Sequence, residues 1–207
     1  MTIRLYGIAA SRTARPLWLL EEIGAPYEHV SQTYQGGATR TPEFLALNPN
    51  GHIPVLVDGD VVVWESMAIT LYLARRLGGP LAPANAAEEA EVLRWTFWVV
   101  TECEKDALAV LMHRVAMPAD KRDPEVAARA EGALKRPLAV LDAHLAGRPY
   151  IAGERFTVAD VNVASVLAWA QSSRTLMDAA PNVAAWLERC LARPAQQTVR
   201  GLAKAGR

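Results

Sequence analysis

Cysteine is nearly absent from this sequence of 207 residues, which contains only Cys103 and Cys190. Two cysteines cannot form a disulfide framework or a cysteine-based zinc site. They suit a reducing compartment, in which free thiols stay reduced. The N-terminal half has no cysteine at all, so it cannot hold a redox-active dithiol. The four histidines are scattered without metal-ligand spacing, and we therefore expect no metal site.

An excess of one charge and a long apolar run are also missing. Lys and Arg number 22, as do Asp and Glu, which gives a formal net charge of +0. Such a chain has no electrostatic reason to bind nucleic acid or an anionic membrane. The apolar stretch 161–173 is interrupted by Asn162 and Ser165 and falls below the ~18 residues of a membrane span. The N-terminus does not resemble a signal peptide, so we expect a cytoplasmic protein.

The composition that remains is typical of globular proteins, since 51% of residues are hydrophobic and 21% are charged. In the first part of the chain, short apolar runs alternate with helical patterns. Two of these runs flank Asp58-Gly59-Asp60, which is a strong hairpin signal. The predicted order is strand, helix, strand, short helix, strand, strand and helix, at residues 3–8, 11–23, 27–30, 41–47, 55–57, 61–64 and 65–77. This order indicates a small α+β domain of thioredoxin type.

The second part of the chain contains no strand pattern. A segment rich in Gly, Pro and Ala separates the two parts and is typical of a linker. Leu134, Leu138, Leu141 and Leu145 then repeat at the spacing of an amphipathic helix. We therefore expect a thioredoxin-like domain at residues 1–78, a linker at 79–86 and an all-α helical bundle domain at 87–207.

Two hydroxyl residues, Ser11 and Thr13, occupy the turn between the first strand and the first helix. In a thioredoxin-like layout, reactive thiols lie at this turn, close to the positive end of the helix. A hydroxyl at that position can donate a hydrogen bond to a thiolate that a ligand supplies. An ordinary helix cap explains the same residues, because Ser and Thr are favoured there.

Two further pairs precede a strand and a helix. Pro54 follows Ile53 directly before a predicted strand; if their peptide bond is cis, the backbone of Ile53 can pair with an extended peptide ligand. The alternative is a trans proline that merely begins the strand. Glu65 precedes Ser66, which we expect to cap the following helix. A helix N-terminus beside a carboxylate suits an α-amino-acid group, although an ordinary cap accounts for the pair as well.

Taken together, these features resemble the cytosolic glutathione S-transferase family, and the resemblance covers essentially the whole chain. The overall pattern is closest to bacterial members, without assignment to a class. The segments that carry it are LY at 5–6, Ser11, Arg15, LWLLEE at 17–22, PEF at 42–44, NP at 48–49, IPVL at 53–56, ESMAI at 65–69, YL at 72–73 and GERFTVAD at 153–160. Within the last segment, Thr157 and Asp160 have the spacing of a capping pair, which we expect to be structural.

The resemblance implies glutathione as co-substrate, no other cofactor, and a small hydrophobic electrophile bound largely against the second domain. It assigns Ser11 to the glutathione sulfur, Glu65 and Ser66 to the γ-glutamyl group, and the backbone of Ile53, beside a cis Pro54, to the cysteinyl unit. His52 then lies near the glycine carboxylate. The implied activity is thiol conjugation to electrophiles or reduction of peroxides, and family members are homodimers.

Several alternatives stay open at this point. Thr13 shares the turn with Ser11 and could donate to the thiolate, and Tyr6 lies where other branches of the family use a tyrosine hydroxyl. Glu102 and His113 are candidates for the electrophile pocket. The chain could also be a non-catalytic binding or scaffold protein, or a disulfide reductase that uses only ligand thiols. The intact Glu65-Ser66 and Ile53-Pro54 pairs favour ligand binding.

Overall fold

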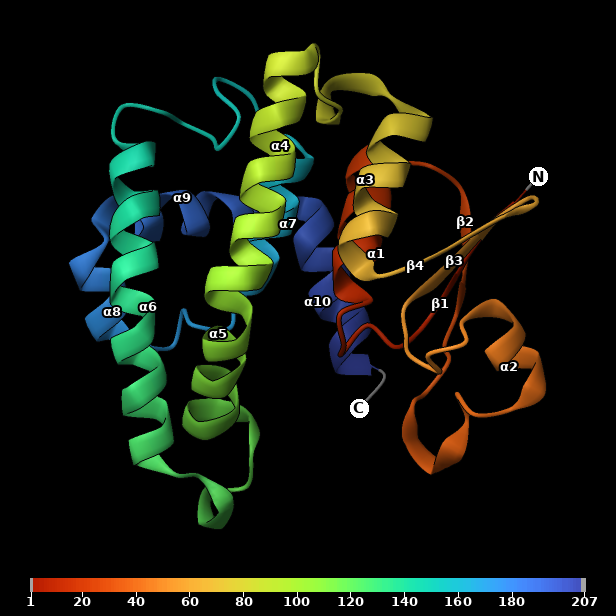
Figure 1. The fold of residues 1–207 in the computed structure, drawn as a ribbon, viewed down its shortest axis with the longest axis horizontal. Coiled ribbons are helices and arrows are strands. Elements are labelled where there is room, and N and C mark those ends of the chain that lie inside the picture. Colours follow the sequence, from red (N-terminus) through yellow and green to blue (C-terminus); the bar gives the residue numbers. More distant parts are fainter. Residues whose placement is uncertain (1, 206–207) are drawn as a thin grey trace. The chain divides into compact units, whose positions relative to one another are not determined.

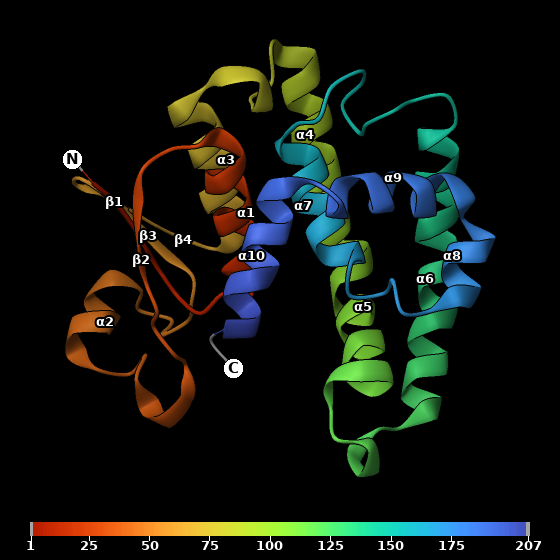
Figure 2. The same cartoon turned by 180° about the vertical axis from the view of Figure 1, so that it is seen from behind.

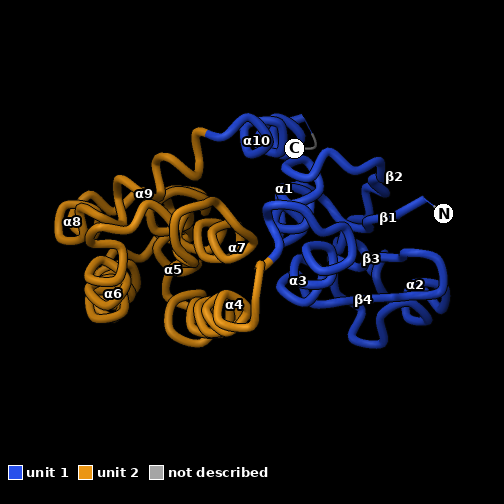
Figure 3. The backbone as a smooth tube through the Cα atoms, turned by 90° about the horizontal axis from the view of Figure 1, so that it is seen from above, with its two compact units in different colours: residues 1–82, 193–207 blue, residues 83–192 orange. Residues whose placement is uncertain are grey.

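The computed structural model describes residues 2–205, which divide into two compact units (Figure 3). The first unit runs up to Ala82 and includes the segment from Arg193 onward, whereas the second runs from Pro83 to Ala192. None of the helices in the described part of the chain is long and apolar enough to cross a membrane.

A four-stranded sheet with the order β2-β1-β3-β4 forms the centre of the first unit. The strands are β1 (Ile3–Tyr6), β2 (Tyr27–Val30), β3 (Val55–Asp58) and β4 (Val61–Trp64). The pair β1–β2 is parallel, and the pairs β1–β3 and β3–β4 are antiparallel. The turn at Gly59, whose φ of 61° suits glycine, closes the predicted hairpin between β3 and β4.

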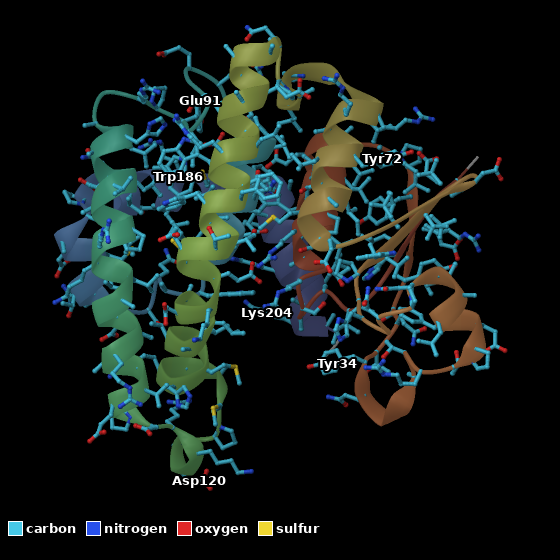
Figure 4. The ribbon with its side chains drawn as sticks, in the orientation of Figure 1. Tyr34, Tyr72, Glu91, Asp120, Trp186 and Lys204 are labelled. Carbon is cyan, nitrogen blue, oxygen red and sulfur yellow. The ribbon has the colours of Figure 1, made fainter. Side chains whose placement is uncertain are left out.

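The helices of the first unit lie on both faces of the sheet. Helices α1 (Ala14–Ile23) and α3 (Ser66–Leu77) pack side by side on one face, and α2 (Pro42–Leu47) lies on the other (Figures 1 and 2). Helix α1 ends as predicted, because Gly24 adopts a left-handed conformation at φ 71°. The hydroxyl of Tyr72 donates a 2.9 Å hydrogen bond to Asp58 and so ties α3 to the end of β3; Figure 4 labels Tyr72 on α3.

The first unit also contains the last helix of the chain, α10 (Pro194–Ala205), which packs against α1. Arg193 at its start forms two 2.7 Å hydrogen bonds to the carboxylate of Glu22 on α1. The sequence pattern placed this segment with the second domain, whereas the structure groups it with the first unit. An amphipathic pattern indicates that one face of a helix is buried, but it does not indicate which domain that face packs against.

The second unit consists of helices, as expected from its sequence. A continuous helical run comprises α4 (Ala86–Trp98), a π-helical turn (Val99–Cys103), α5 (Glu104–Leu111) and a second π-helical turn (Met112–Ala116). The sequence analysis expected only helices in this domain and did not predict either π turn. The remaining helices are α6 (Pro124–Leu145), α7 (Val158–Leu167), α8 (Arg174–Ala179) and α9 (Pro181–Leu191).

The core of the second unit forms around the predicted leucine stripe of α6. Leu134, Leu138, Leu141 and Leu145 are all buried, and Trp186 of α9 lies among the helices (Figure 4). Helix α7 begins with the predicted capping box, in which the carboxylate of Asp160 accepts a 2.9 Å hydrogen bond from the backbone N–H of Thr157. This box therefore serves the packing of the second unit.

Candidate active site

The candidate site lies at one edge of the sheet, where three chain segments meet. Val55, the first residue of β3, pairs with Tyr6 at the end of β1 and with Trp64 at the end of β4. The turn after β1, the residues before β3 and the start of α3 after β4 therefore lie next to one another. The structure thus brings together the three segments that the sequence analysis singled out.

The turn after β1 is held by the side chain of Ser11. Its Oγ donates a 2.7 Å hydrogen bond to the carbonyl oxygen of Ile8 and lies 2.9 Å from Oγ1 of Thr13. It also accepts a 3.1 Å hydrogen bond from the backbone N–H of Thr13. Helix α1 begins only at Ala14, so Ser11 lies in the preceding turn instead of at the expected helix start. Its side chain is half-buried.

Thr13 lies beneath this turn, and its side chain has no exposed surface. The space for its hydroxyl is provided by Gly7, whose φ is 139°. A Cβ atom at position 7 would lie 2.1 Å from Oγ1 of Thr13, which is far inside contact distance. The hydroxyl of Thr13 therefore reaches Ser11 and not the surface.

Arg15 connects the start of α1 to the start of α3. Its side chain is buried, with 2% of its surface exposed, and its Nη1 donates a 2.9 Å hydrogen bond to the hydroxyl of Ser66. Ser66 is the first residue of α3, and Glu65, not Ser66, occupies the capping position that the sequence analysis gave to the serine. The hydroxyl of Ser66 is thereby held beside a guanidinium group.

Glu65 has the only positive φ among the non-glycine residues that the structure describes, at φ 72° and ψ 116°. A conformation of this kind costs on the order of 1–3 kcal/mol and persists where the surrounding structure imposes it. The side chain of Glu65 is exposed. Nothing in the sequence signals this backbone conformation, because glutamate is not a residue that favours positive φ.

The Ile53–Pro54 peptide bond is cis, which was one of the two conformations left open by the sequence. Within residues 2–205, the backbone N–H and C=O of Ile53 have no hydrogen-bond partner, and the residue is partly exposed. The preceding turn is fixed by Asn48, whose Nδ2 donates a 2.8 Å hydrogen bond to the carbonyl oxygen of His52. The imidazole of His52 itself is exposed.

Arg40 is a cation at this turn that the sequence analysis missed. Its Nη1 donates a 3.2 Å hydrogen bond to the carbonyl oxygen of Asn50, and it packs closely against Gly51. A Cβ atom at Gly51 would lie 2.7 Å from this nitrogen and 2.8 Å from the carbonyl oxygen of Thr39. The one available signal was Gly51 itself, because glycine allows close approach of another chain segment.

Of the other expected candidates, Tyr6 lies at the same edge of the sheet, and Glu102 and His113 belong to the second unit. Tyr6 is partly exposed at the end of β1, with the guanidinium of Arg4 6.0 Å from the centre of its ring. Glu102 and His113 lie in the two π turns of the second unit, and Nδ1 of His113 accepts a 3.0 Å hydrogen bond from the backbone N–H of Asp123. In the described residues, no three His, Cys, Asp or Glu side chains form a group that could hold a metal ion.

Comparison with known proteins decides the family. Residues 1–75 match the N-terminal domain model of glutathione S-transferases, and residues 105–194 match the C-terminal domain model. This chain belongs to the glutathione S-transferase family. The match confirms both the resemblance seen in the sequence and the expected glutathione S-transferase fold, with a thioredoxin-like domain followed by helices.

Individual relatives cover nearly the whole chain. Glutathione S-transferase 3 of Zea mays is 38% identical over 95% of this chain and 93% of its own length. The structure of maize glutathione S-transferase I with an atrazine glutathione conjugate has a TM-score of 0.88 at 31% identity and covers all of both chains. A theta-class glutathione S-transferase from Xanthomonas axonopodis pv. citri, with glutathione bound, has a TM-score of 0.84 at 34% identity, over 95% of this chain and 96% of that one.

Proposed function

We propose that this protein is a glutathione transferase that activates the thiol of bound glutathione with the hydroxyl of Ser11. The observation that carries the proposal is the half-buried Ser11 hydroxyl in the turn before α1, at the edge of the sheet where β1 and β3 meet. The chain has no cysteine before Cys103, so a sulfur nucleophile at this edge has to come from the ligand. Relatives with glutathione or a glutathione conjugate bound support this ligand.

The energetics of such a site are sufficient without a metal or a general base. A thiol with a pKa of ~8.5 is only a few per cent thiolate at neutral pH. Lowering the pKa by about two units requires ~2.7 kcal/mol. A hydrogen bond to a charged group contributes ~1.5–3 kcal/mol, and a helix N-terminus adds up to ~2 kcal/mol. One hydroxyl at the start of α1 therefore suffices to make the thiolate the main form.

The remaining parts of glutathione are assigned to the other segments of the same edge. The unpaired backbone of Ile53, beside cis Pro54, hydrogen-bonds the cysteinyl unit as an added strand does. Glu65 binds the ammonium of the γ-glutamyl group, and the start of α3 at Ser66 binds its carboxylate.

The glycine carboxylate of glutathione lies near His52 in this proposal. Arg40 supplies a permanent positive charge at the same turn, where it already contacts the backbone of Asn50. A guanidinium group suits a carboxylate because it offers paired N–H donors in a fixed plane. Arg40 therefore adds a second basic side chain beside His52 for binding the carboxylate.

The thiolate then attacks an electrophilic carbon of a small hydrophobic compound, and the product is a thioether conjugate. The structure of the maize relative with a bound atrazine glutathione conjugate supports a small hydrophobic electrophile as the second substrate. A hydroperoxide is a second substrate class, because the same thiolate can attack its oxygen. We expect the protein to act in the cytoplasm.

The test measures retention on immobilised glutathione and turnover with a generic aryl halide and a hydroperoxide. We expect retention together with conjugation of the aryl halide, and slower reduction of the hydroperoxide. Retention without any turnover against a broad panel of electrophiles would favour the binding or scaffold alternative. Turnover of a glutathione mixed disulfide alone would favour the disulfide reductase.

We further infer that the protein is a homodimer, as the resemblance implies. Exposed apolar side chains on β4 (Val61, Val62 and Trp64) and on the α4 run (Leu93, Phe97 and Val100) support a protein partner. We expect light scattering to give the dimer mass and Phe97→Asp to give the monomer. Val140→Asp on α6 is the matched control, since Val140 is similarly exposed, at 51% against 63% for Phe97. A monomeric wild-type protein would contradict the proposal.

A further inference from the structure

The hydroxyl of Thr13 has one polar neighbour that matters for the proposed reaction, namely Ser11. The side chain of Thr13 is completely buried, and its Oγ1 lies 2.9 Å from Oγ of Ser11. Thr13 therefore has no exposed atom with which to touch a ligand. It can act on bound glutathione only through Ser11.

A count of protons fixes the direction of the hydrogen bond between the two hydroxyls. Ser11 has a single hydroxyl proton, and it donates this proton to the carbonyl oxygen of Ile8 at 2.7 Å. In the Ser11–Thr13 pair, Thr13 is consequently the donor. Ser11 Oγ also accepts the backbone N–H of Thr13 at 3.1 Å. A hydroxyl oxygen has two acceptor positions, and Thr13 occupies both of them.

We propose that Thr13 is a positioning residue that makes the Ser11 hydroxyl a hydrogen-bond donor only. With both acceptor positions filled, the Ser11 oxygen is held in place, and its proton is confined to the one remaining position, which faces the carbonyl oxygen of Ile8. The sulfur of bound glutathione accepts this proton from the same side, in place of the carbonyl oxygen of Ile8. The donated bond from Thr13 also polarises the Ser11 O–H group, because consecutive hydrogen bonds strengthen one another. This inference rests on the function proposed above.

Gly7 completes the arrangement. Its missing Cβ makes room for the Thr13 hydroxyl, since an atom at that position would lie 2.1 Å from Oγ1. The peptide of Gly7 is fixed to β2, because its N–H donates to the carbonyl oxygen of Val30 at 3.0 Å and its carbonyl oxygen lies 2.7 Å from Nε2 of His29. The strand thus holds Gly7, Gly7 accommodates Thr13, and Thr13 orients Ser11.

The experiment compares Thr13→Val, which removes the hydroxyl and keeps the shape, with Thr13→Ser, which keeps the hydroxyl. The readout is the pKa of the thiol of bound glutathione, measured by titrating the ultraviolet absorbance of the thiolate. We expect Thr13→Val to raise this pKa by about one unit, from about 6.5, which lowers the thiolate fraction at neutral pH roughly threefold. We expect Thr13→Ser to restore it, and the affinity for S-methylglutathione, which has no thiol, to stay unchanged in both variants.

Thr70→Val is the matched control for loss of a buried threonine hydroxyl. Thr70 is fully buried in α3 and donates a 2.8 Å hydrogen bond to the carbonyl oxygen of Met67. We expect this variant to keep the thiol pKa of the wild type. Thermal unfolding midpoints report the folding of every variant, and Thr13→Ala replaces Thr13→Val in the same comparison if the valine variant does not fold.

The Ser11→Ala background tests whether Thr13 acts through Ser11. We expect Thr13→Val to cause no further rise of the thiol pKa there, because a positioning residue has nothing left to position. A full additional rise would show that Thr13 acts on the sulfur independently, and a wild-type pKa in folded Thr13→Val would show that it does not act at all; either result overturns the inference. A wild-type protein that binds glutathione without lowering its thiol pKa would instead overturn the proposed function.

Discussion

Each unit contains a helix that begins beside hydroxyl groups, and the two helix starts use their polar atoms differently. Before α1, Ser11 and Thr13 bond to each other and to the carbonyl oxygen of Ile8, with no acidic residue in the first turn. At the start of α7, the carboxylate of Asp160 accepts hydrogen bonds from the backbone N–H groups of Ile151 and Thr157 at 3.0 and 2.9 Å. It also accepts one from the indole of Trp186 at 2.9 Å.

The carboxylate of Asp160 stabilises the fold, whereas the hydroxyl of Ser11 is suited to binding a ligand. Asp160 is fully buried, and burial raises the pKa of its carboxyl even though the hydrogen bonds that it accepts work against the shift. All of its partners belong to its own unit, so removing it leaves buried donors unsatisfied. Ser11 is half-buried and has one proton that it can donate to a ligand in place of the carbonyl oxygen of Ile8. Its removal leaves fewer buried donors unsatisfied than removal of Asp160 does, and in addition it removes the donor of the proposed reaction.

The largest expected effect is that of Asp160→Ala on the free energy of unfolding. The variant leaves two backbone N–H groups and the indole N–H of Trp186 without their acceptor, at about 1–3 kcal/mol for each unsatisfied group. We expect a loss of about 4 kcal/mol in urea unfolding followed by circular dichroism. Asp160→Asn, which keeps the shape and one oxygen acceptor, should lose less. An unchanged unfolding midpoint in both variants would break the comparison between the two helix starts.

The next effect is that of Ser11→Ala, which should act mainly on chemistry and lower stability less than Asp160→Ala does. Loss of one hydrogen bond to a charged sulfur removes ~1.5–3 kcal/mol, which corresponds to a rise of about one to two units in the pKa of bound glutathione. We expect kcat/KM for an aryl halide at neutral pH to fall about 3- to 25-fold, in proportion to the thiolate fraction. Urea unfolding should shift by about 1–2 kcal/mol, because the buried N–H and hydroxyl of Thr13 lose their acceptor.

A stability loss in Ser11→Ala as large as that of Asp160→Ala would contradict the distinction drawn between the two starts. An unchanged thiolate titration in the folded variant would transfer the donor role to another hydroxyl, of which Tyr6 is the partly exposed candidate. The two readouts are independent, since one reports unfolding and the other reports the bound thiol.

A third helix start, that of α3, extends the comparison. The residue before α3, Glu65, has a strained backbone conformation. Glu65→Gly removes the Cβ atom that makes φ 72° unfavourable, whereas Glu65→Ala keeps that atom and loses only the carboxylate. We expect the glycine variant to be about 1 kcal/mol more stable than the alanine variant in urea unfolding. Both should bind glutathione more weakly than the wild type by isothermal titration calorimetry. Equal affinity in all three proteins would remove Glu65 from the proposed site.

The smallest expected effect concerns the thiol of Cys103 in the second unit. Burial raises its pKa to about 12, helped by the nearby carboxylates of Glu102 and Asp106, so the thiol stays protonated at neutral and mildly alkaline pH. We expect iodoacetamide to leave Cys103 of the native protein unmodified in peptide mass spectra and to leave conjugation activity unchanged. Rapid labelling with loss of activity would mean that the second unit contributes a thiol to the reaction.

Much of the first unit could be predicted from local sequence patterns. The strand pattern around Asp58-Gly59-Asp60 predicted the β3–β4 hairpin, and the helix predicted over residues 11–23 ends where α1 ends. The candidate segments at Ser11, Ile53 and Glu65 were found because hydroxyl, proline and carboxylate residues precede regular elements there. Signals of this kind are local, since they depend on the conformation that a few neighbouring residues prefer.

Other features depend on residues that are distant in the sequence and could not be predicted in this way. Arg40 reaches the turn at Asn50 because Gly51 leaves space for it, and the start of α3 is held by Arg15, 51 positions earlier in the chain. The position of α10 depends on the ion pair between Arg193 and Glu22. Neither the charge of these arginines nor the helical pattern around them specifies which distant residue each one contacts.

The sequence by itself determined the α+β and all-helical halves, the family, and the kind of atom available at the candidate site, because hydrophobic periodicity and residue chemistry are properties of short segments. The tertiary structure alone decided that Thr13 is buried against Gly7 and fills the acceptor positions of Ser11, and that Glu65 adopts a positive φ. Those properties arise from packing, in which the position of one atom depends on the space that distant segments leave.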